Sequence, residues 1–296
     1  MNARDLLLIL IVCLAWAGNF LTSALSLREF SPLLFTALRL LLLGLLLIAF
    51  LKPPPRAQMG RLVAVALCNS VLHFGLSFWA LKLAGDIASP AIVMQSYVPM
   101  AAMLAWVLLG ERFAWRTGLA ILVSFAGILV LGFDPLVLDR PESLLLMLVS
   151  AFFLALGTVL MRDLKGIAAL SLQGWSAWIG TFPLLLLSLL IEPDPRAQLA
   201  SASPIAWMGV IYAAVIASML GHSLFYLLVQ RHPVAQLTPY FLLSPVLAVM
   251  LGIAFWGDRP GPRLWIGGAM VLSGVLAIAL RTLAKRRAAV RPEALT

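Results

Sequence analysis

The sequence predicts an all-α membrane protein with ten transmembrane helices, arranged as two inverted five-helix repeats. Its composition, its succession of apolar segments and its internal self-similarity each point to this fold class. Of the 296 residues, 62% are hydrophobic and only 11% are charged, and the mean hydropathy is +1.03. A soluble domain carries about twice that charged fraction, roughly 25%. A membrane-embedded chain is therefore the class that fits.

Ten apolar segments have the length expected of a membrane crossing. A hydrocarbon layer about 30 Å thick needs roughly 20 apolar residues in a helix. The expected spans are about 6–27, 32–51, 62–82, 87–109, 115–133, 143–161, 169–191, 204–229, 233–256 and 264–281. The breaks between them, such as KPPPR (52–56) and GDRPGPR (257–263), are too short to hold a soluble domain.

The first span permits two interpretations. Residues 13–20 read CLAWAGNF, and Ala15–Trp16–Ala17 has the small-x-small shape of a signal-peptidase site. Removal of this segment would leave nine spans and reverse the charge asymmetry described next. The second half also contains a counterpart, LALGTVLMR (154–162). We therefore expect the helix to be kept to about Leu27, with Gly18 and Asn19 inside the membrane.

Lysine and arginine are distributed unevenly between the two sides of the expected bundle. One side carries fourteen: Arg4, Lys52, Arg56, Arg61, Arg112, Arg116, Arg162, Lys165, Arg231, Arg281, Lys285, Arg286, Arg287 and Arg291. The other side carries six: Arg28, Lys82, Arg140, Arg196, Arg259 and Arg263. Because cytoplasmic loops are enriched in these residues, both termini are expected to be cytoplasmic.

The net charge of +9 does not indicate nucleic-acid binding. The charges are thinly spread, apart from the basic tail, which is better explained as a flank facing anionic lipid. Cys13 and Cys68 both lie in apolar runs and are expected to be packing residues. Their positions offer no metal-ligand spacing.

The two halves of the chain resemble each other. Glu111, Arg112 and Gly127 recur as Asp258, Arg259 and Gly274 at a spacing of 147, and Pro99 recurs as Pro245 one residue out of step. Each half holds five spans, so the second half must be inverted relative to the first. We expect repeats at 1–136 and 137–283, followed by a basic cytoplasmic tail at 284–296. Inverted repeats with a site near the midplane are typical of secondary transporters.

Several of these segments resemble a known family. AWAGNF, SPLLFTALRLLLLGLLL (31–47), VPMAAMLAWVLLGERF and FAGILVL resemble the EamA-type half-domain of the drug/metabolite transporter superfamily, and the second half resembles another copy. The run 212–246, with VMQS (93–96), is most similar to the amino-acid-metabolite exporters of that family. Two departures, Asp258 in place of Glu and Ala-Gly after Trp16, do not affect the fold. The resemblance implies a permease in a bacterial inner membrane that exports O-acetylserine, cysteine or a related compound.

Polar residues within the spans need a partner or a function. Arg39 is either a carboxylate-binding cation or an arginine that reaches a membrane surface or helix carbonyls. Asn69, His73 and Ser77 share one helix face, and Ser218, His222 and Tyr226 repeat that spacing. Gln95, opposite a weaker stripe with Tyr240, extends the pattern. These stripes face either a shared cavity or neighbouring helices, to which they would hydrogen-bond.

Aromatic residues and prolines complete the candidate site. Trp16 and Trp175 are expected at mid-depth, with membrane-interface positions as the alternative. Pro99 and Pro245 are either hinges or static bends. The proposed substrate-binding residues are Trp16, Asn19, Arg39, His73, Ser77, Gln95, Trp175, His222, Tyr226 and Tyr240. We expect no catalytic residue, metal or cofactor.

Other function classes lack their chemistry in this sequence. No Asp or Glu lies inside an expected span and no Walker motif occurs, which argues against an intramembrane protease and an ATP-driven pump. Only His73 and His222 could carry a coupled proton, so proton antiport and facilitated diffusion stay open. A small-multidrug-type exporter of cationic or amphipathic drugs is the main alternative, and a passive channel is another. The expected partners are a small solute and the bilayer; the sequence leaves the oligomeric state open.

Overall fold

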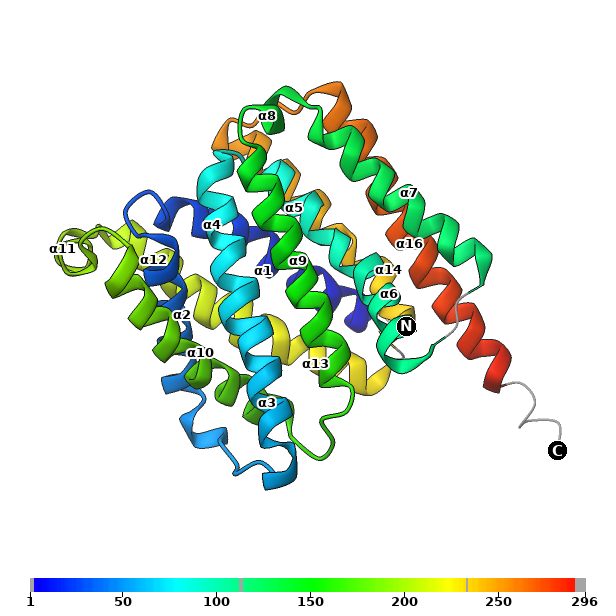
Figure 1. Cartoon of the computed structure of the whole chain (residues 1–296), viewed down its shortest axis with the longest axis horizontal. Coiled ribbons are helices and arrows are strands. Elements are labelled where there is room, and N and C mark those ends of the chain that lie inside the picture. Colours follow the sequence, from blue (N-terminus) through cyan, green and yellow to red (C-terminus); the bar gives the residue numbers. More distant parts are fainter. Residues whose placement is uncertain (1–2, 112–113, 233, 291–296) are drawn as a thin grey trace.

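The chain forms a bundle of helices in the computed structural model (Figure 1). The structure describes residues 3–111, 114–232 and 234–290, and it describes only the backbone of residues 136, 226, 229, 230, 234–236, 238 and 285–290. Every regular element within these ranges is helical. This confirms the all-α class expected of a membrane protein.

The two halves of the chain contain a similar succession of helices. The first half contains α1 (Ala3–Ser26), α2 (Pro32–Leu46), η1 (Ile48–Phe50), η2 (Arg56–Gln58), α3 (Met59–Ala66), η3 (Leu67–His73), α4 (Phe74–Ala84), α5 (Ala88–Val93), η4 (Met94–Ser96), α6 (Tyr97–Leu109) and α7 (Trp115–Gly132). The rest contains α8 (Pro135–Leu138), α9 (Pro141–Met161), α10 (Ala169–Ile191), α11 (Pro195–Ser201), α12 (Pro204–Ile211), η5 (Tyr212–Gly221), α13 (His222–Arg231), α14 (Val234–Phe241), α15 (Leu243–Leu251), η6 (Gly252–Trp256) and α16 (Pro262–Val290).

Nine helical segments of the described chain are long and apolar enough to cross a membrane. They match nine of the ten expected spans. The remaining one, expected at 32–51, is the shorter α2, whose α-helix ends at Leu46. After Leu46 the chain continues as the short 3₁₀ segment η1, and the prolines at 53–55 prevent any further continuation of this helix. The last helix, in contrast, runs past the expected end near 281 to Val290.

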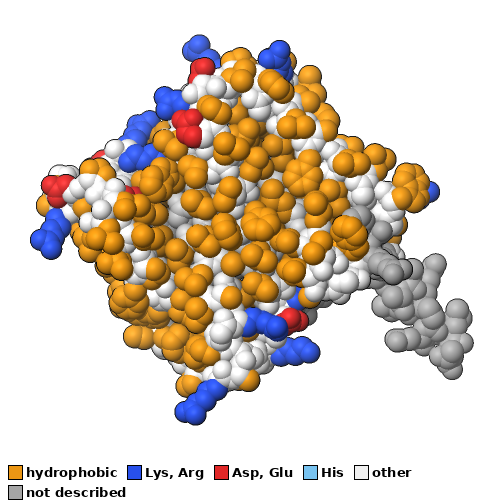
Figure 2. All heavy atoms as spheres, viewed as in Figure 1, with side chains coloured by type: hydrophobic (Ala, Val, Ile, Leu, Met, Phe, Trp, Pro, Cys, Tyr) orange, Lys and Arg blue, Asp and Glu red, His pale blue; other side chains and the backbone are white. Residues whose placement is uncertain are grey.

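The outer surface is apolar over a wide area (Figure 2). Trp115, Phe255 and Leu190 each expose more than 70% of their surface. In the view of Figure 2, the charged side chains gather toward the rim rather than on the broad central face. A soluble monomer rarely exposes so large an apolar patch. This surface suits the hydrocarbon of a bilayer.

The bundle has two ends. The terminal end is the one where α1 begins and α16 ends. The distal end is the one where α1 ends and where α2 and α16 begin. Hydrogen bonds at each end fit membrane helices that run in alternate directions. Trp256, at the end of η6, donates to the Gly85 carbonyl after α4 at the distal end, over 2.9 Å. At the terminal end, Trp175 of α10 donates to the Lys52 carbonyl, also over 2.9 Å.

Two helices that the sequence repeat makes equivalent contain π-helical segments. η3 (Leu67–His73) interrupts the third expected span and η5 (Tyr212–Gly221) interrupts the eighth. π-helical turns are rare and are frequent at functional sites. Their presence at corresponding places draws attention to the space between these two helices.

Small residues let α7 and α16 pack against each other closely. A Cβ added at Gly127 would lie 2.6 Å from the Gly267 carbonyl oxygen, and one added at Gly274 would meet Ser124. Gly127 and Gly274 are the glycines that recur in the sequence repeat. Close approach through small residues is a common way for membrane helices to associate.

The two prolines expected as hinges occupy the same place in their helices. Pro99 is the third residue of α6 and Pro245 the third residue of α15. A 3₁₀ segment (η4) precedes α6, and a single turn residue, Leu242, precedes α15 with backbone dihedrals in the right-handed helical region. Each proline therefore lies just after a break in the regular α-helix.

Candidate functional site

The site is built around Arg39, which lies in the middle of α2. Its side chain is only 2% exposed. One nitrogen, Nη2, donates to Ser218 Oγ of η5 over 2.7 Å. Arg39 thus joins the second helix of the first half to the eighth expected span. Because the arginine is buried, it does not reach a membrane surface, as one of the two interpretations of the sequence proposed.

Two aromatic rings of α4 surround the guanidinium. Its central carbon lies 4.2 Å from the centre of the Phe74 ring and 5.1 Å from that of Phe78. The Phe74 and Phe78 rings are stacked, with centres 6.0 Å apart. A cation over an aromatic face is stabilised by the ring quadrupole, most strongly where water is excluded. The rings therefore stabilise the guanidinium beside α4.

Two donors of this guanidinium have no partner. Nε and Nη1 are buried and make no hydrogen bond, and none of the ion pairs found among the described residues includes Arg39. A buried charge without an ionic partner is unfavourable by several kcal/mol, on the order of 3 to 5. An anionic group from outside the chain would relieve this cost. The geometry of a guanidinium suits a carboxylate, which binds in a bidentate manner.

Ser218 of η5 forms the wall of the site that the second half of the chain contributes. Besides accepting from Arg39, its hydroxyl donates to the Ala213 carbonyl over 2.8 Å, five residues back along the π-helical segment. Its own carbonyl accepts from Gln173 Nε2 of α10 over 3.1 Å. Nδ1 of His222 lies 3.1 Å from the same carbonyl. Three helices thus meet at one serine.

A cluster of aromatic rings lies next to this wall. Trp16 of α1 donates from Nε1 to the Ala217 carbonyl over 3.2 Å. Its ring centre lies 5.6 Å from His222, 5.7 Å from Phe225 and 5.5 Å from Phe241. The side chain of His222 is exposed. This mainly aromatic cluster, with His222 as its polar member, lies beside Ser218, the residue that Arg39 contacts.

His73 bonds to a neighbouring helix. Its Nδ1 lies 2.9 Å from Ser150 Oγ of α9, and Ser150 donates back to the His73 carbonyl over 2.9 Å. Its ring also contacts Phe74, with centres 4.7 Å apart. Ser77 donates to the Phe74 carbonyl on its own helix. This geometry favours interhelical bonding for His73, while Phe74 connects it to the Arg39 site.

The remaining predicted residues are scattered. Asn19 lies on α1 one turn beyond Trp16, and its Oδ1 lies 3.4 Å from Ser23 Oγ. Gln95 is half-buried in η4. Trp175 lies at the terminal end, as its bond to Lys52 shows, and Tyr240 is 45% exposed. The side chain of Tyr226 lies outside the described residues.

Two residues of the candidate site, Gln173 and Ser150, were not predicted from the sequence. Gln173 was not singled out, although an amide inside an apolar span is itself a signal. Ser150 has no such signal, since a serine in a membrane helix usually bonds its own backbone. No metal-binding group of His, Cys, Asp or Glu occurs among the described residues.

Comparison with known proteins shows which family the chain resembles. Two segments, residues 4–133 and 142–280, match the EamA-like transporter family. A protein of Escherichia coli (strain K12) described as a "Probable amino-acid metabolite efflux pump" is 24% identical over 283 residues, covering 93% of this chain and 94% of its own length. Its namesake in Salmonella typhimurium (strain LT2) is 27% identical over the same coverage.

Another relative and a solved structure are also similar to this chain. A "Probable terminal-alkyne amino-acid exporter" of Streptantibioticus cattleyicolor is 27% identical over 248 residues, covering 80% of this chain and 79% of its own. One crystal structure superimposes with a TM-score of 0.61 at 21% identity, covering 97% of this chain and 99% of the other. At that identity the superposition shows the fold alone.

Proposed function

The chain belongs to the EamA-like transporter family, and from this membership we propose that it exports an amino acid or an amino-acid derivative across a bacterial inner membrane. The printed names of the relatives, two of them amino-acid metabolite efflux pumps, support this substrate class. We further propose ten membrane helices in two inverted halves, residues 1–136 and 137–283, with the tail 284–296 in the cytoplasm. In this arrangement the terminal end is cytoplasmic and the distal end faces outward.

The guanidinium of Arg39, with two of its three nitrogens unbonded and no ion-pair partner among the described residues, carries the substrate proposal. All amino acids and most of their derivatives contain a carboxylate, and the buried donors Nε and Nη1 of Arg39 each lack a hydrogen bond that such a group could supply once the halves part. The contact between Arg39 and Ser218 crosses from one half to the other. A solute bound here would touch both halves, as alternating access requires.

The rest of the solute has a suitable surface nearby. The rings of Trp16, Phe225 and Phe241 offer an apolar wall, and His222 adds an exposed polar group. Small amphipathic solutes are bound by such mixed surfaces. Asn19 and Gln95 are the further polar groups that we assign to the path.

Binding at the centre must be followed by movement of the two halves. Pro99 and Pro245, each just after a helix break, are the positions at which we propose that α6 and α15 bend. Their equivalent places in the two halves support a paired movement.

The main alternative is an exporter of cationic drugs. A buried positive charge at the site repels a quaternary ammonium ion, unless an acid lies close by to balance it. No described Asp or Glu forms an ion pair with Arg39. The charge at the centre therefore favours anionic or zwitterionic solutes over cations.

Counterflow in proteoliposomes tests the proposal. Vesicles preloaded with unlabelled amino acids should accumulate the labelled form, and Arg39→Gln should abolish this exchange. Arg56→Gln, at an exposed arginine, is the matched control and should keep it. Flux of quaternary ammonium ions without amino-acid exchange would favour the drug exporter, and hydrolytic turnover would overturn the transporter.

Coupling to protons is tested in the same vesicles. His222 is exposed beside the site, whereas His73 is bonded to Ser150, so we assign any coupling proton to His222. An imposed pH gradient should drive accumulation in the wild type and fail to do so in His222→Gln. Flux that ignores the gradient in both proteins would indicate facilitated diffusion.

A further inference from the structure

We propose that the distal end is the outer gate of the transporter, closed in this structure by four carboxylates that each cap a helix start in the opposite half. This inference rests on the proposed function in one respect, that the two halves separate at this end when the site opens outward. Hydrogen bonds at four places on the distal end support it.

The first cap joins Glu192, after α10, to the start of α2. Glu192 Oε1 accepts from the Leu33 backbone nitrogen over 2.7 Å, and Oε2 accepts from Leu34 over 3.0 Å and from Ser31 Oγ over 2.8 Å. The glutamate is 9% exposed. The first backbone N–H groups of a helix have no partner within it and carry the positive end of its dipole. One buried carboxylate of the second half therefore satisfies α2 of the first.

The second cap joins Asp258, between η6 and α16, to the start of α5. Its Oδ2 accepts from the backbone nitrogens of Ile87 and Ala88, each over 2.9 Å. Asp258 is 6% exposed, and burial raises its pKa. A Cβ at Gly252 would collide with Asp258 Oδ2, so this glycine makes room for the cap.

The other two caps run in the reverse direction. Asp134, after α7, is fully buried and accepts at Oδ2 from the Leu264 nitrogen of α16 over 2.9 Å. Glu29, between α1 and α2, accepts from the nitrogen of Ser203, the residue before α12, over 2.6 Å, and also from its hydroxyl. These bonds from Ser203 lower the pKa of Glu29.

The four caps are reciprocal between the halves. Two acids of the second half bind helices of the first, and two acids of the first half bind helices of the second. Hydrogen bonds to a carboxylate are about twice as strong as neutral ones. The caps away from the α7–α16 contact must break, or be replaced by water, before the halves can part at the distal end, whereas the cap of Asp134 on α16 lies along that contact.

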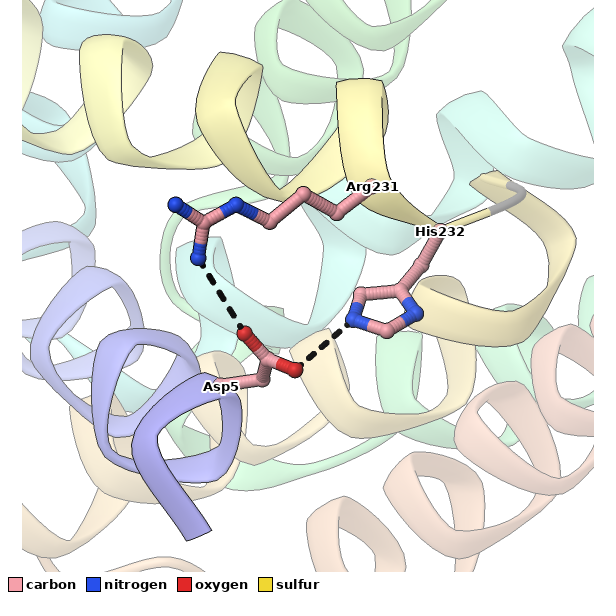
Figure 3. A network of polar contacts seen from close by, with 3 residues as sticks. All are labelled: Asp5, Arg231 and His232. Carbon is pink, nitrogen blue, oxygen red and sulfur yellow. Dashed lines mark hydrogen bonds and ion pairs between the residues drawn. The ribbon is translucent and has the colours of Figure 1, made fainter. Parts of the chain in front are cut away.

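The terminal end is held differently. Its ion pairs Arg61–Asp163 and Arg162–Glu111 also cross between the halves, but their side chains are 45% to 55% exposed. Exposed pairs contribute little, about 0 to 1 kcal/mol each. Among the ion pairs of the described residues at this end, only those of Asp5 are buried on the acid side. Asp5, with a side chain 5% exposed, meets Arg231 over 3.6 Å and His232 over 2.9 Å (Figure 3).

The two ends therefore resist separation unequally. The distal end has four capping acids, three of them less than 10% exposed, and the terminal end depends mainly on exposed pairs. The closed gate thus lies on the distal side. Opening toward the cytoplasm breaks the weaker contacts and leaves the caps intact.

Thiol labelling tests the gate without any substrate. The reporter is Ser77→Cys, a small change at a residue 5% exposed on α4, the helix that leads from Arg39 toward the distal end. It is placed in a chain with Cys13→Ser and Cys68→Ser, so that the reporter is the only thiol that the maleimide can label. A membrane-impermeant maleimide is then added from outside to intact cells. We expect slow labelling with all caps present.

Removing two caps should speed this labelling by about tenfold or more, because each cap contributes on the order of 1 kcal/mol. The variant is Glu192→Gln with Asp258→Asn. The matched control is Glu111→Gln, the repeat counterpart of Asp258 at the terminal end, which should leave outside labelling unchanged. Equal labelling with and without the caps, or equal acceleration by Glu111→Gln, would overturn the proposal.

Two further measurements distinguish gate opening from general unfolding and from an error in the proposed substrate. In a chain that keeps Cys13, buried at 0% exposure, and lacks the Ser77 reporter, labelling should stay slow; fast labelling would indicate general unfolding and count against a gate. Failure of amino-acid counterflow together with cap-dependent labelling would remove the proposed substrate and keep the gate. Counterflow without cap-dependent labelling would support the proposed substrate and overturn the gate.

Discussion

Arg39 and Ser218 lie 179 positions apart in the chain, and a 2.7 Å hydrogen bond joins them at the centre of the bundle. Ser218 also belongs to the π-helical segment η5, and its hydroxyl bonds five residues back to Ala213. The arginine is thus oriented by the second half while its two unpartnered nitrogens are left for a ligand.

The first prediction separates the functional role of Arg39 from a structural one. Arg39→Met should eliminate exchange of a carboxylate-bearing solute, while the melting temperature of the purified protein stays equal or rises. The reason is that replacing a buried unpaired ion by an apolar residue is often stabilising. Thermal unfolding in detergent measures this. A large drop in the melting temperature would show that Arg39 holds the fold instead.

The second prediction concerns the shape of the arginine. Arg39→Lys should keep the charge but weaken solute binding about 10-fold, because an ammonium group cannot bind a carboxylate through two parallel bonds. Binding of the solute is measured by titration calorimetry or by the half-saturating concentration in counterflow. Unchanged affinity in Arg39→Lys would mean that the charge alone acts.

The third prediction tests the coupling between Arg39 and Ser218. Ser218→Ala should weaken solute binding about 10- to 100-fold, the effect of losing one hydrogen bond to a charged group. In the Arg39→Gln background the same change should have little further effect. A double-mutant cycle on binding gives the interaction. Additive losses would show that Ser218 acts independently of Arg39.

The fourth prediction is a pH dependence of the outer gate. Burial raises the pKa of Asp86 from its ordinary 3.8 to about 7. The surrounding groups are Ser89, which donates to it, the acids Asp134 and Asp258, and Arg140, which lines the same small cavity. Once opening hydrates Asp86, its pKa returns toward the ordinary value.

The sign follows from these two values. The closed state binds the proton more tightly, so acid favours closure, and this advantage is lost as pH rises through about 7. Lowering the outside pH from 8 to 6 should slow labelling of Ser77→Cys by up to about tenfold. Division by the rate at exposed Ser201→Cys corrects for thiol ionisation. Asp86→Asn should remove the dependence, and a dependence of the opposite sign would contradict the gate.

The fifth prediction concerns the packing of α7 against α16. Gly127→Ala should lower the melting temperature clearly, because the added methyl would lie 2.6 Å from the Gly267 carbonyl oxygen. Gly60→Ala adds the same methyl where no atom lies within 4 Å and should have little effect. Equal behaviour of the two variants would show that α7 and α16 do not need the close approach.

The sequence predicted most of the architecture and part of the site. Nine expected spans are matched, since apolar length alone identifies a membrane helix. The end of α2 at Leu46 was missed because the apolar run continues to residue 51 while the helix does not. Spacing grouped His73 with Ser77, yet it could not show that His73 turns to Ser150, because periodicity gives a helix face and not its neighbour.

The distal acids show a second limit of the sequence. Of Asp134, Glu192 and Asp258, only Asp258 was singled out from the sequence, as the repeat counterpart of Glu111, and composition suggests that acids in loops are exposed. They are buried because each one meets the start of a helix distant in the chain. Such pairings depend on tertiary contacts, and no local pattern reports them.

The backbone contact between α7 and α16 determines where relative motion is largest. These helices end the two halves and touch at Gly127 and Gly267, so they leave little freedom to slide. A rotation of one half about this line gives displacements that grow with distance from it. In Figure 1, α2 and α12 lie on the opposite side of the molecule from α7 and α16. The caps formed by Glu192 and Glu29 therefore have the longest lever arm, and a small rotation separates their atoms first.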